Sequence, residues 1–135
     1  MRIVLDTNVI TVAISRRSKF YPIWQSLRNG DYELVATSDI LAEYEEIIGG
    51  DLSPEIANFV LDTLDNLPNV SYLNRYFNWN LIAEDPDDDK FVDCAFAGNA
   101  DFLVTNDRHF NVLKTHPFPK IKVLSADEFL DLLLM

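Results

Sequence analysis

Short apolar runs, separated by segments with helical sequence patterns, are the feature that most constrains the fold of this chain. The runs are continuous rather than alternating, which is typical of strands buried on both faces of a sheet. Strands that alternate with helices predict a parallel sheet covered by helices, so we expect a single three-layer α/β/α sandwich over residues 1–135. The expected strands are RIVLD at 2–6, YELVAT at 32–37, NVSYL at 69–73, DFLVTN at 101–106 and KIKVL at 120–124.

Capping signals set the expected ends of the helices. Ser38 is a candidate N-cap with Gly49 and Gly50 as the stop of the same helix, and Ser125 with Glu128 matches a capping box. Residues 74–84 carry no pattern that we can assign. The expected helices cover 20–30, 38–50, 53–67, 87–98, 108–114 and 125–135.

Composition excludes several classes of protein. A chain of 135 residues that is 48% hydrophobic can bury a core and is not disordered. No run is long enough to span a membrane, and the N-terminus does not resemble a signal peptide. Cys94 is the one cysteine, so no internal disulfide can form. We therefore expect a cytoplasmic protein with no membrane association.

The chain is strongly acidic, with 22 Asp and Glu against 11 Lys and Arg and a net charge of −11. Such a charge argues against a broad electrostatic grip on nucleic acid. It does not exclude an enzyme that acts on nucleic acid through acids that hold metal ions. The excess of acidic over basic residues is larger than the candidate site acids could account for. Many of the acids are therefore ordinary solvated residues on the surface.

The densest acidic stretch is EDPDDDKFVDCAFAGNADFLVTND at 84–107. Helix capping and the helix dipole explain Asp85 and Asp87, which come at the start of an expected helix. They do not explain Asp89 and Asp93, which lie four residues apart and flank the apolar stripe of that helix. Like charges at this spacing destabilise a helix, so a positive group is expected beside them.

Acids from separate segments are expected to meet at one edge of the sheet. Asp6 ends the first strand and Asp107 follows the fourth, while Glu43 and Asp89 lie in the first turns of helices that begin at that edge. Open α/β sheets bind ligands at the carboxyl ends of their strands. Several carboxylates at one site cannot all ionise unaided, and oxygen-rich acidic clusters suit Mg²⁺ or Mn²⁺.

Four segments together resemble the PIN domain family. They are IVLDTNV, SDILAEYEEI, DPDDDKFVDCA and ADFLVTND, and their order and spacing carry the resemblance, which covers nearly the whole chain. It is greatest to the VapC-like branch described as toxins of toxin–antitoxin systems. The resemblance implies a Mg²⁺- or Mn²⁺-dependent endoribonuclease that hydrolyses RNA through four acids, with an antitoxin protein as a possible partner.

Carried over by motif, the resemblance implies roles for particular residues. The catalytic acids would be Asp6, Glu43, Asp89 and Asp107, of which Asp6, Asp89 and Asp107 would bind metal with Asp93 as a further ligand. Asp89 is preferred over Asp88 because of its spacing from Asp107, although Asp88 stays open as the ligand. The supporting and substrate-binding candidates are Asn8, Thr105, Asp88, Arg16, Arg17, Lys19 and Arg108.

Two other readings remain open at this point. One is a PIN-like fold used as a non-catalytic binding or regulatory module. The other is an aspartyl-phosphate enzyme, although Asn8 stands where a phosphatase of that kind has a second aspartate. The outer helices also carry Tyr21, Trp24, Phe59 and Val60, more apolar surface than one face can bury, so we expect a homodimer and a groove for an antitoxin segment.

Overall fold

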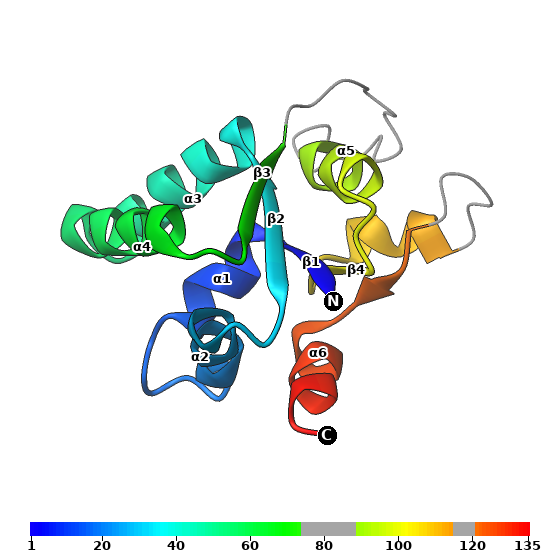
Figure 1. Ribbon diagram of the computed structural model, residues 1–135, viewed down its shortest axis with the longest axis horizontal. Coiled ribbons are helices and arrows are strands. Elements are labelled where there is room, and N and C mark those ends of the chain that lie inside the picture. Colours follow the sequence, from blue (N-terminus) through cyan, green and yellow to red (C-terminus); the bar gives the residue numbers. More distant parts are fainter. Residues whose placement is uncertain (74–88, 115–120) are drawn as a thin grey trace.

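A five-stranded parallel sheet with the strand order β3-β2-β1-β4-β5 runs through the middle of the protein (Figure 1). The computed structural model describes residues 1–73, 89–114 and 121–135. All described strand pairs are parallel, so the predicted sheet is confirmed. The elements are β1 Arg2–Leu5, α1 Thr7–Ala13, α2 Tyr21–Asn29, β2 Glu33–Thr37, α3 Ser38–Asp51, α4 Pro54–Asn66, β3 Val70–Leu73, α5 Asp89–Ala97, β4 Phe102–Val104, the 3₁₀ helix η2 Arg108–Lys114, β5 Val123–Leu124 and α6 Ala126–Leu133.

Helices cover both faces of the sheet, as predicted for a three-layer sandwich. Helices α1 to α4 lie on one side of the strands and α5 on the other (Figure 1). Helix α6 packs beside α2, where the rings of Tyr32 and Phe129 meet edge to face with centroids 5.1 Å apart. Residues Ile3, Val4 and Leu5 of β1 are at most 1% exposed, because this central strand is buried on both faces.

Several predicted helix ends are confirmed by cap geometry. Gly30 ends α2 in the left-handed conformation at φ 83°, which a residue without a Cβ adopts readily. The Ser53 hydroxyl accepts from the backbone N–H of Ile56 at 3.1 Å. At the start of α6, Ser125 and Glu128 form the complete capping box.

Helix α3 differs from its predicted ends. Thr37, not Ser38, is the N-cap residue, and its hydroxyl bonds to the side chain of Asp39. The helix also continues through Gly49 and Gly50 to Asp51. Helix α4 packs along α3, and a Cβ at Gly49 would lie at an ordinary contact distance of 3.7 Å from the Cβ of Ala57. Here packing between helices outweighs the low helix propensity of glycine.

Other differences concern short elements. Helix α1 was not predicted, since seven residues directly after Asp6 are too few to show a clear period. Strand β5 is Val123–Leu124, so of the predicted 120–124 the described residues Ile121 and Lys122 lie outside the strand, while residue 120 is outside the described part of the chain. Helix α5 is described from Asp89, while the proposed caps Asp85 and Asp87 lie outside the described residues.

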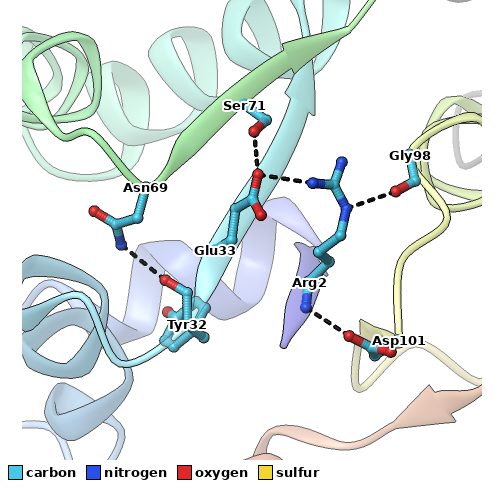
Figure 2. A network of polar contacts seen from close by, with 7 residues as sticks. All are labelled: Arg2, Tyr32, Glu33, Asn69, Ser71, Gly98 and Asp101. Atoms are coloured by element: carbon cyan, nitrogen blue, oxygen red, sulfur yellow. Dashed lines mark hydrogen bonds and ion pairs between the residues drawn. The ribbon is translucent and has the colours of Figure 1, made fainter.

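Polar side chains tie the amino edge of the sheet together (Figure 2). Arg2 donates to the carbonyl of Gly98 at 2.7 Å and to Glu33 Oε2 at 2.8 Å, and its backbone N–H donates to Asp101 Oδ2 at 2.7 Å. The Ser71 hydroxyl bonds to the same Glu33 oxygen. One arginine at the start of β1 thereby links β1, β2 and the turn between α5 and β4, while Glu33 extends the link to β3.

Gly98 lies where this turn crosses the sheet and leaves no room for a side chain. A Cβ at this position would lie 2.6 Å from Cγ1 of Val35 and 2.8 Å from Cδ1 of Leu73. We predict that Gly98→Ala lowers the free energy of unfolding by about 1–3 kcal/mol, measured by urea denaturation. The matched control is Gly50→Ala, because nothing lies within 4 Å of that helical position. The control should gain about 0.5–1 kcal/mol, and equal stability of the two variants would contradict the packing argument.

Candidate active site

The predicted acids lie in or directly after four elements whose ends are at the carboxyl edge of the sheet. Asp6 follows β1 and is the N-cap residue of α1, and Asp107 follows β4. Glu43 lies in α3, while Asp89 opens α5. Helix α5 contacts β1, β4 and α3, so residues distant in sequence are brought to one rim.

Asp6 is a buried carboxylate, only 5% exposed. The Thr105 hydroxyl donates to Asp6 Oδ2 at 2.7 Å. Burial is the largest cause that raises the pKa of Asp6, and the negative charges of Asp107 and Glu43 raise it further. Hydrogen bonds from Thr105 and from the backbone of Thr7 oppose this shift without cancelling it. The charges of Asp107 and Glu43 are therefore near enough to act on the carboxylate of Asp6.

Thr105 connects the two strand ends that carry acids. Besides its bond to Asp6, its hydroxyl oxygen accepts from the backbone N–H of Asp107 at 3.0 Å. Asp107 in turn accepts from the backbone N–H of His109 at 2.9 Å through Oδ1. The β1 and β4 ends are also joined directly, since the N–H of Asp6 donates to the Val104 carbonyl at 2.9 Å.

Glu43 is held by a cation and a hydroxyl. Its Oε1 lies 2.7 Å from the ammonium of Lys90 on α5, and its Oε2 accepts from the hydroxyl of Thr7. Neither contact was predicted. No sequence signal indicated them, because both contacts depend on how α3 packs against α1 and α5.

Tyr44 fixes the end of the strand that carries Asp6. Strand β1 pairs with β2 only at Arg2 and Ile3, whereas its pairing with β4 continues to Leu5. On the β2 side, the fully buried Tyr44 hydroxyl donates to the Leu5 carbonyl at 2.6 Å. The Tyr44 side chain therefore supplies a donor to the Leu5 carbonyl, which lies past the last residue pair of β1 and β2. Leu5 directly precedes Asp6, so this bond fixes the backbone next to the Asp6 carboxylate.

The remaining predicted residues lie in different surroundings. Asp89 and Asp93 on α5 are 3% and 2% exposed, so they face the interior and not solvent. Asn8 is exposed and makes no hydrogen bond to Asp6 in the part of the chain that the structure describes. Asp88 lies outside the described residues.

The predicted substrate-binding residues are exposed and scattered. Arg16 and Arg17 lie between α1 and α2, and Arg108 begins η2 directly after Asp107. Lys19 forms an ion pair with Asp127 of α6 at 2.6 Å, although both side chains are more than 60% exposed. Such an exposed pair contributes little to stability.

The donor chemistry of the rim fits Mg²⁺ or Mn²⁺. Its acids offer oxygen atoms, which these hard cations prefer, and a cation would relieve the repulsion at Asp6. Across residues 1–73, 89–114 and 121–135, no three histidine, cysteine or acidic side chains form a group that could hold an ion alone. This is compatible with Mg²⁺, which often takes one or two carboxylates and completes its shell with water and substrate oxygens.

No helix in the described part of the chain is long and apolar enough to cross a membrane. Residues 2–109 match the sequence profile of the family described as PIN domain. No curated protein matches the chain.

The chain also resembles solved structures over most of its length. One is described as VapBC2 from Rickettsia felis bound to a DNA fragment from their promoter, with a TM-score of 0.61 and 21% identity, covering 93% of this chain and 98% of that chain. Another is DNA-bound VapBC from Salmonella typhimurium, with a TM-score of 0.58 and 16% identity over the same shares. At these identities the likeness shows the fold alone.

The raised pKa of Asp6 predicts how stability varies with pH in metal-free protein. Because the pKa in the folded state exceeds the ordinary value of 3.8, stability falls as pH rises from that value through the folded-state pKa. Asp6→Asn imitates the protonated acid and can still accept from Thr105. We expect the variant to be more stable than the wild type at pH 7 in chelator, with the difference closing in acid.

Thermal and denaturant unfolding across pH would measure this difference. Asp62→Asn is the matched control, since Asp62 is an exposed acid on α4 and its loss should leave the pH profile nearly unchanged. A clear loss of stability in Asp6→Asn at pH 7 would mean that the ionised carboxylate stabilises the fold instead.

Proposed function

This chain belongs to the PIN domain family, and on that basis we propose that it is a metal-dependent endoribonuclease, the toxin of a toxin–antitoxin pair. The observation that carries the proposal is the buried carboxylate of Asp6, whose pKa is raised by burial and by Asp107 and Glu43. A fold gains nothing in stability from collecting like charges at one rim. A carboxyl group with a perturbed pKa at the carboxyl edge of an α/β sheet is typical of a functional site.

We propose that the metal ligands come from Asp6, Asp89 and Asp107, with Asp93 as a further candidate; because no three of them are grouped closely enough in the described structure to hold an ion alone, water and substrate oxygens would complete the shell. When bound, Mg²⁺ or Mn²⁺ lowers the pKa of water and stabilises the leaving oxygen of a phosphodiester. The chain's own residues position the acids. Thr105 orients Asp6 and bonds to the backbone of Asp107, and Tyr44 holds the strand end before Asp6.

The proposed reaction is direct hydrolysis without a covalent intermediate. Cys94 is 1% exposed, and burial raises the pKa of its thiol to about 12, so the thiol stays protonated at neutral pH. A protonated, buried thiol is a poor nucleophile. Attack by water on a phosphodiester would leave a 5′-phosphate and a 3′-hydroxyl, and the reaction would not need the 2′-hydroxyl of RNA.

We expect the purified chain to cleave single-stranded RNA with Mg²⁺ or Mn²⁺ and to be inactive in chelator. Asp6→Asn should lower the rate by about 100-fold or more, the scale of losing one preorganised charged group at a reacting centre. The exposed-acid variant Asp62→Asn should cleave like the wild type. Labelled RNA on a denaturing gel, with analysis of the product ends, measures both rate and chemistry.

Two results would count against this function. Cleavage that persists in chelator, or products that end in a 2′,3′-cyclic phosphate, would exclude the proposed hydrolysis. Inactivity of the wild type on every RNA would favour a non-catalytic PIN-fold binding module.

An apolar hollow offers a site for the proposed antitoxin. It has a volume of about 290 Å³, and Phe59 and Ile56 at its rim are 49% and 42% exposed. The two similar solved structures are VapBC complexes, which favours a partner protein for this chain. We propose that an apolar segment of an antitoxin docks here. The lining residues come from the end of α1 and from α2 and α4, and they are Ile14, Trp24, Glu55, Ile56, Phe59 and Val60.

We predict that a cognate antitoxin co-purifies with the wild-type chain and that Phe59→Glu prevents this co-purification. A charge at this position cannot be desolvated against an apolar partner without a large cost. Asn58→Glu is the matched control, since Asn58 is exposed on the same helix and does not line the hollow. Equal recovery of the partner by both variants would place the contact elsewhere.

Light scattering on the chain alone tests the proposed homodimer in the same preparation. A monomer at high micromolar concentration would contradict it.

A further inference from the structure

Helices α3 and α4 form a hairpin that carries only negative charge. Its residues 38–67 include eight Asp and Glu and no Lys or Arg. The two helices pack side by side (Figure 1). Several of these acids are exposed and form no ion pair with a described lysine or arginine, including Glu45, Glu46, Asp51 and Glu55. The hairpin therefore presents a negative potential that the described part of the fold does not neutralise.

Glu55 brings this charge to the apolar hollow beside α4. It is the only charged residue among the described residues that line the hollow. Glu55 lies in the first turn of α4, where the helix dipole favours an acid. The dipole does not account for the apolar side chains beside it, since Ile56 and Phe59 are 42% and 49% exposed. A partner that covers these side chains must also meet the Glu55 carboxylate.

The elements around the hollow indicate the conformation of the segment that fits it. The described lining residues come from helices or helix ends, so they offer no strand edge to which an extended segment could pair. A segment buried against apolar side chains must therefore satisfy its backbone N–H and C=O groups internally, as an α-helix does. An amphipathic helix that lays its apolar face into a hydrophobic groove is a common mode of recognition.

The negative charge disfavours two other occupants of the hollow. The phosphates of RNA would face carboxylates there. A symmetric contact with a second copy of this chain would place the same acidic surface on both sides of the interface, so like charges would face each other. The proposed homodimer would therefore use another surface. A helix with basic side chains is attracted by the same charge that repels RNA and a second copy.

We infer that the hollow beside α4 binds an amphipathic helix of the antitoxin whose apolar face is flanked by Lys or Arg. The apolar side chains of that helix cover Ile56 and Phe59, and a basic side chain lies opposite Glu55. The negative potential of the α3–α4 hairpin adds an attraction that salt weakens. The inference rests on the proposed docking of an antitoxin at this hollow, and it names the chemistry of the docking helix.

Two fluorescently labelled synthetic peptides test this inference on the full chain. Both are amphipathic helices with Leu at positions i, i+3, i+4 and i+7, and their flanking positions are Lys in one peptide and Glu in the other. Fluorescence anisotropy at low salt measures the two dissociation constants. The wild type should bind the Lys peptide at least about tenfold more tightly than the Glu peptide, and added NaCl should narrow this difference.

Charge reversal at one position locates the contact. Glu55→Lys should weaken binding of the Lys peptide by about fivefold or more and strengthen binding of the Glu peptide, whereas Asp31→Lys should change either by no more than about twofold. Asp31 is the matched control, because it is exposed outside the hairpin and its reversal changes the net charge equally. Circular dichroism checks that each variant is folded. Glu55→Gln, which keeps the shape of the side chain, should lower the preference for the Lys peptide and replaces Glu55→Lys if that variant does not fold.

Equal binding of the two peptides by the wild type, or no binding of either, would overturn the inference. Equal losses in Glu55→Lys and Asp31→Lys would overturn it as well, because net charge alone would then explain the preference. These results leave the proposed nuclease standing, since RNA cleavage is measured without a peptide. Equal recovery of the antitoxin by Phe59→Glu and Asn58→Glu would overturn the proposed docking site and this inference with it.

Discussion

A negative charge buried at the end of the central strand is the constraint on which the site depends. Taking the Asp6 carboxylate out of water is unfavourable, and the neighbouring acids Asp107 and Glu43 add to the cost. The surrounding residues offset it only in part. The Thr105 hydroxyl donates to the carboxylate, and the backbone of Thr7 also stabilises its charged form. Tyr44 holds the Leu5 carbonyl, while Thr7 and Lys90 hold Glu43.

The two edges of the sheet differ in how their acidic side chains are paired. At the amino edge, the Arg2 guanidinium pairs with Glu33 and donates to the Gly98 carbonyl, and its backbone N–H donates to Asp101, so these acceptors have donors within the fold (Figure 2). At the carboxyl edge, buried acids outnumber the cations that the described residues bring to them. Proteins keep such imbalance mainly where it serves binding or catalysis. The amino edge therefore secures the strand order that places the acids of the carboxyl edge together.

Much of this arrangement could be predicted because it follows from topology. Continuous apolar runs indicate buried parallel strands, and the carboxyl ends of parallel strands lie at the same edge of a sheet. The sequence therefore predicts that Asp6 and Asp107 lie at this edge. The ion pair between Lys90 and Glu43 could not be predicted, because it depends on how α3 packs against α5. The caps of α3 show the same limit. Thr37 and Ser38 are both good caps, and only the end of β2 decides between them.

The position of β1 in the middle of the sheet has a consequence for synthesis on the ribosome. Its first partner, β2, emerges early, but β4 and the acids Asp89 and Asp107 emerge only in the later part of translation. The side of β1 that pairs with β4 therefore stays unpaired until β4 has been synthesised. The rim cannot assemble until that neighbour arrives, so an unfinished polypeptide has no complete acidic centre.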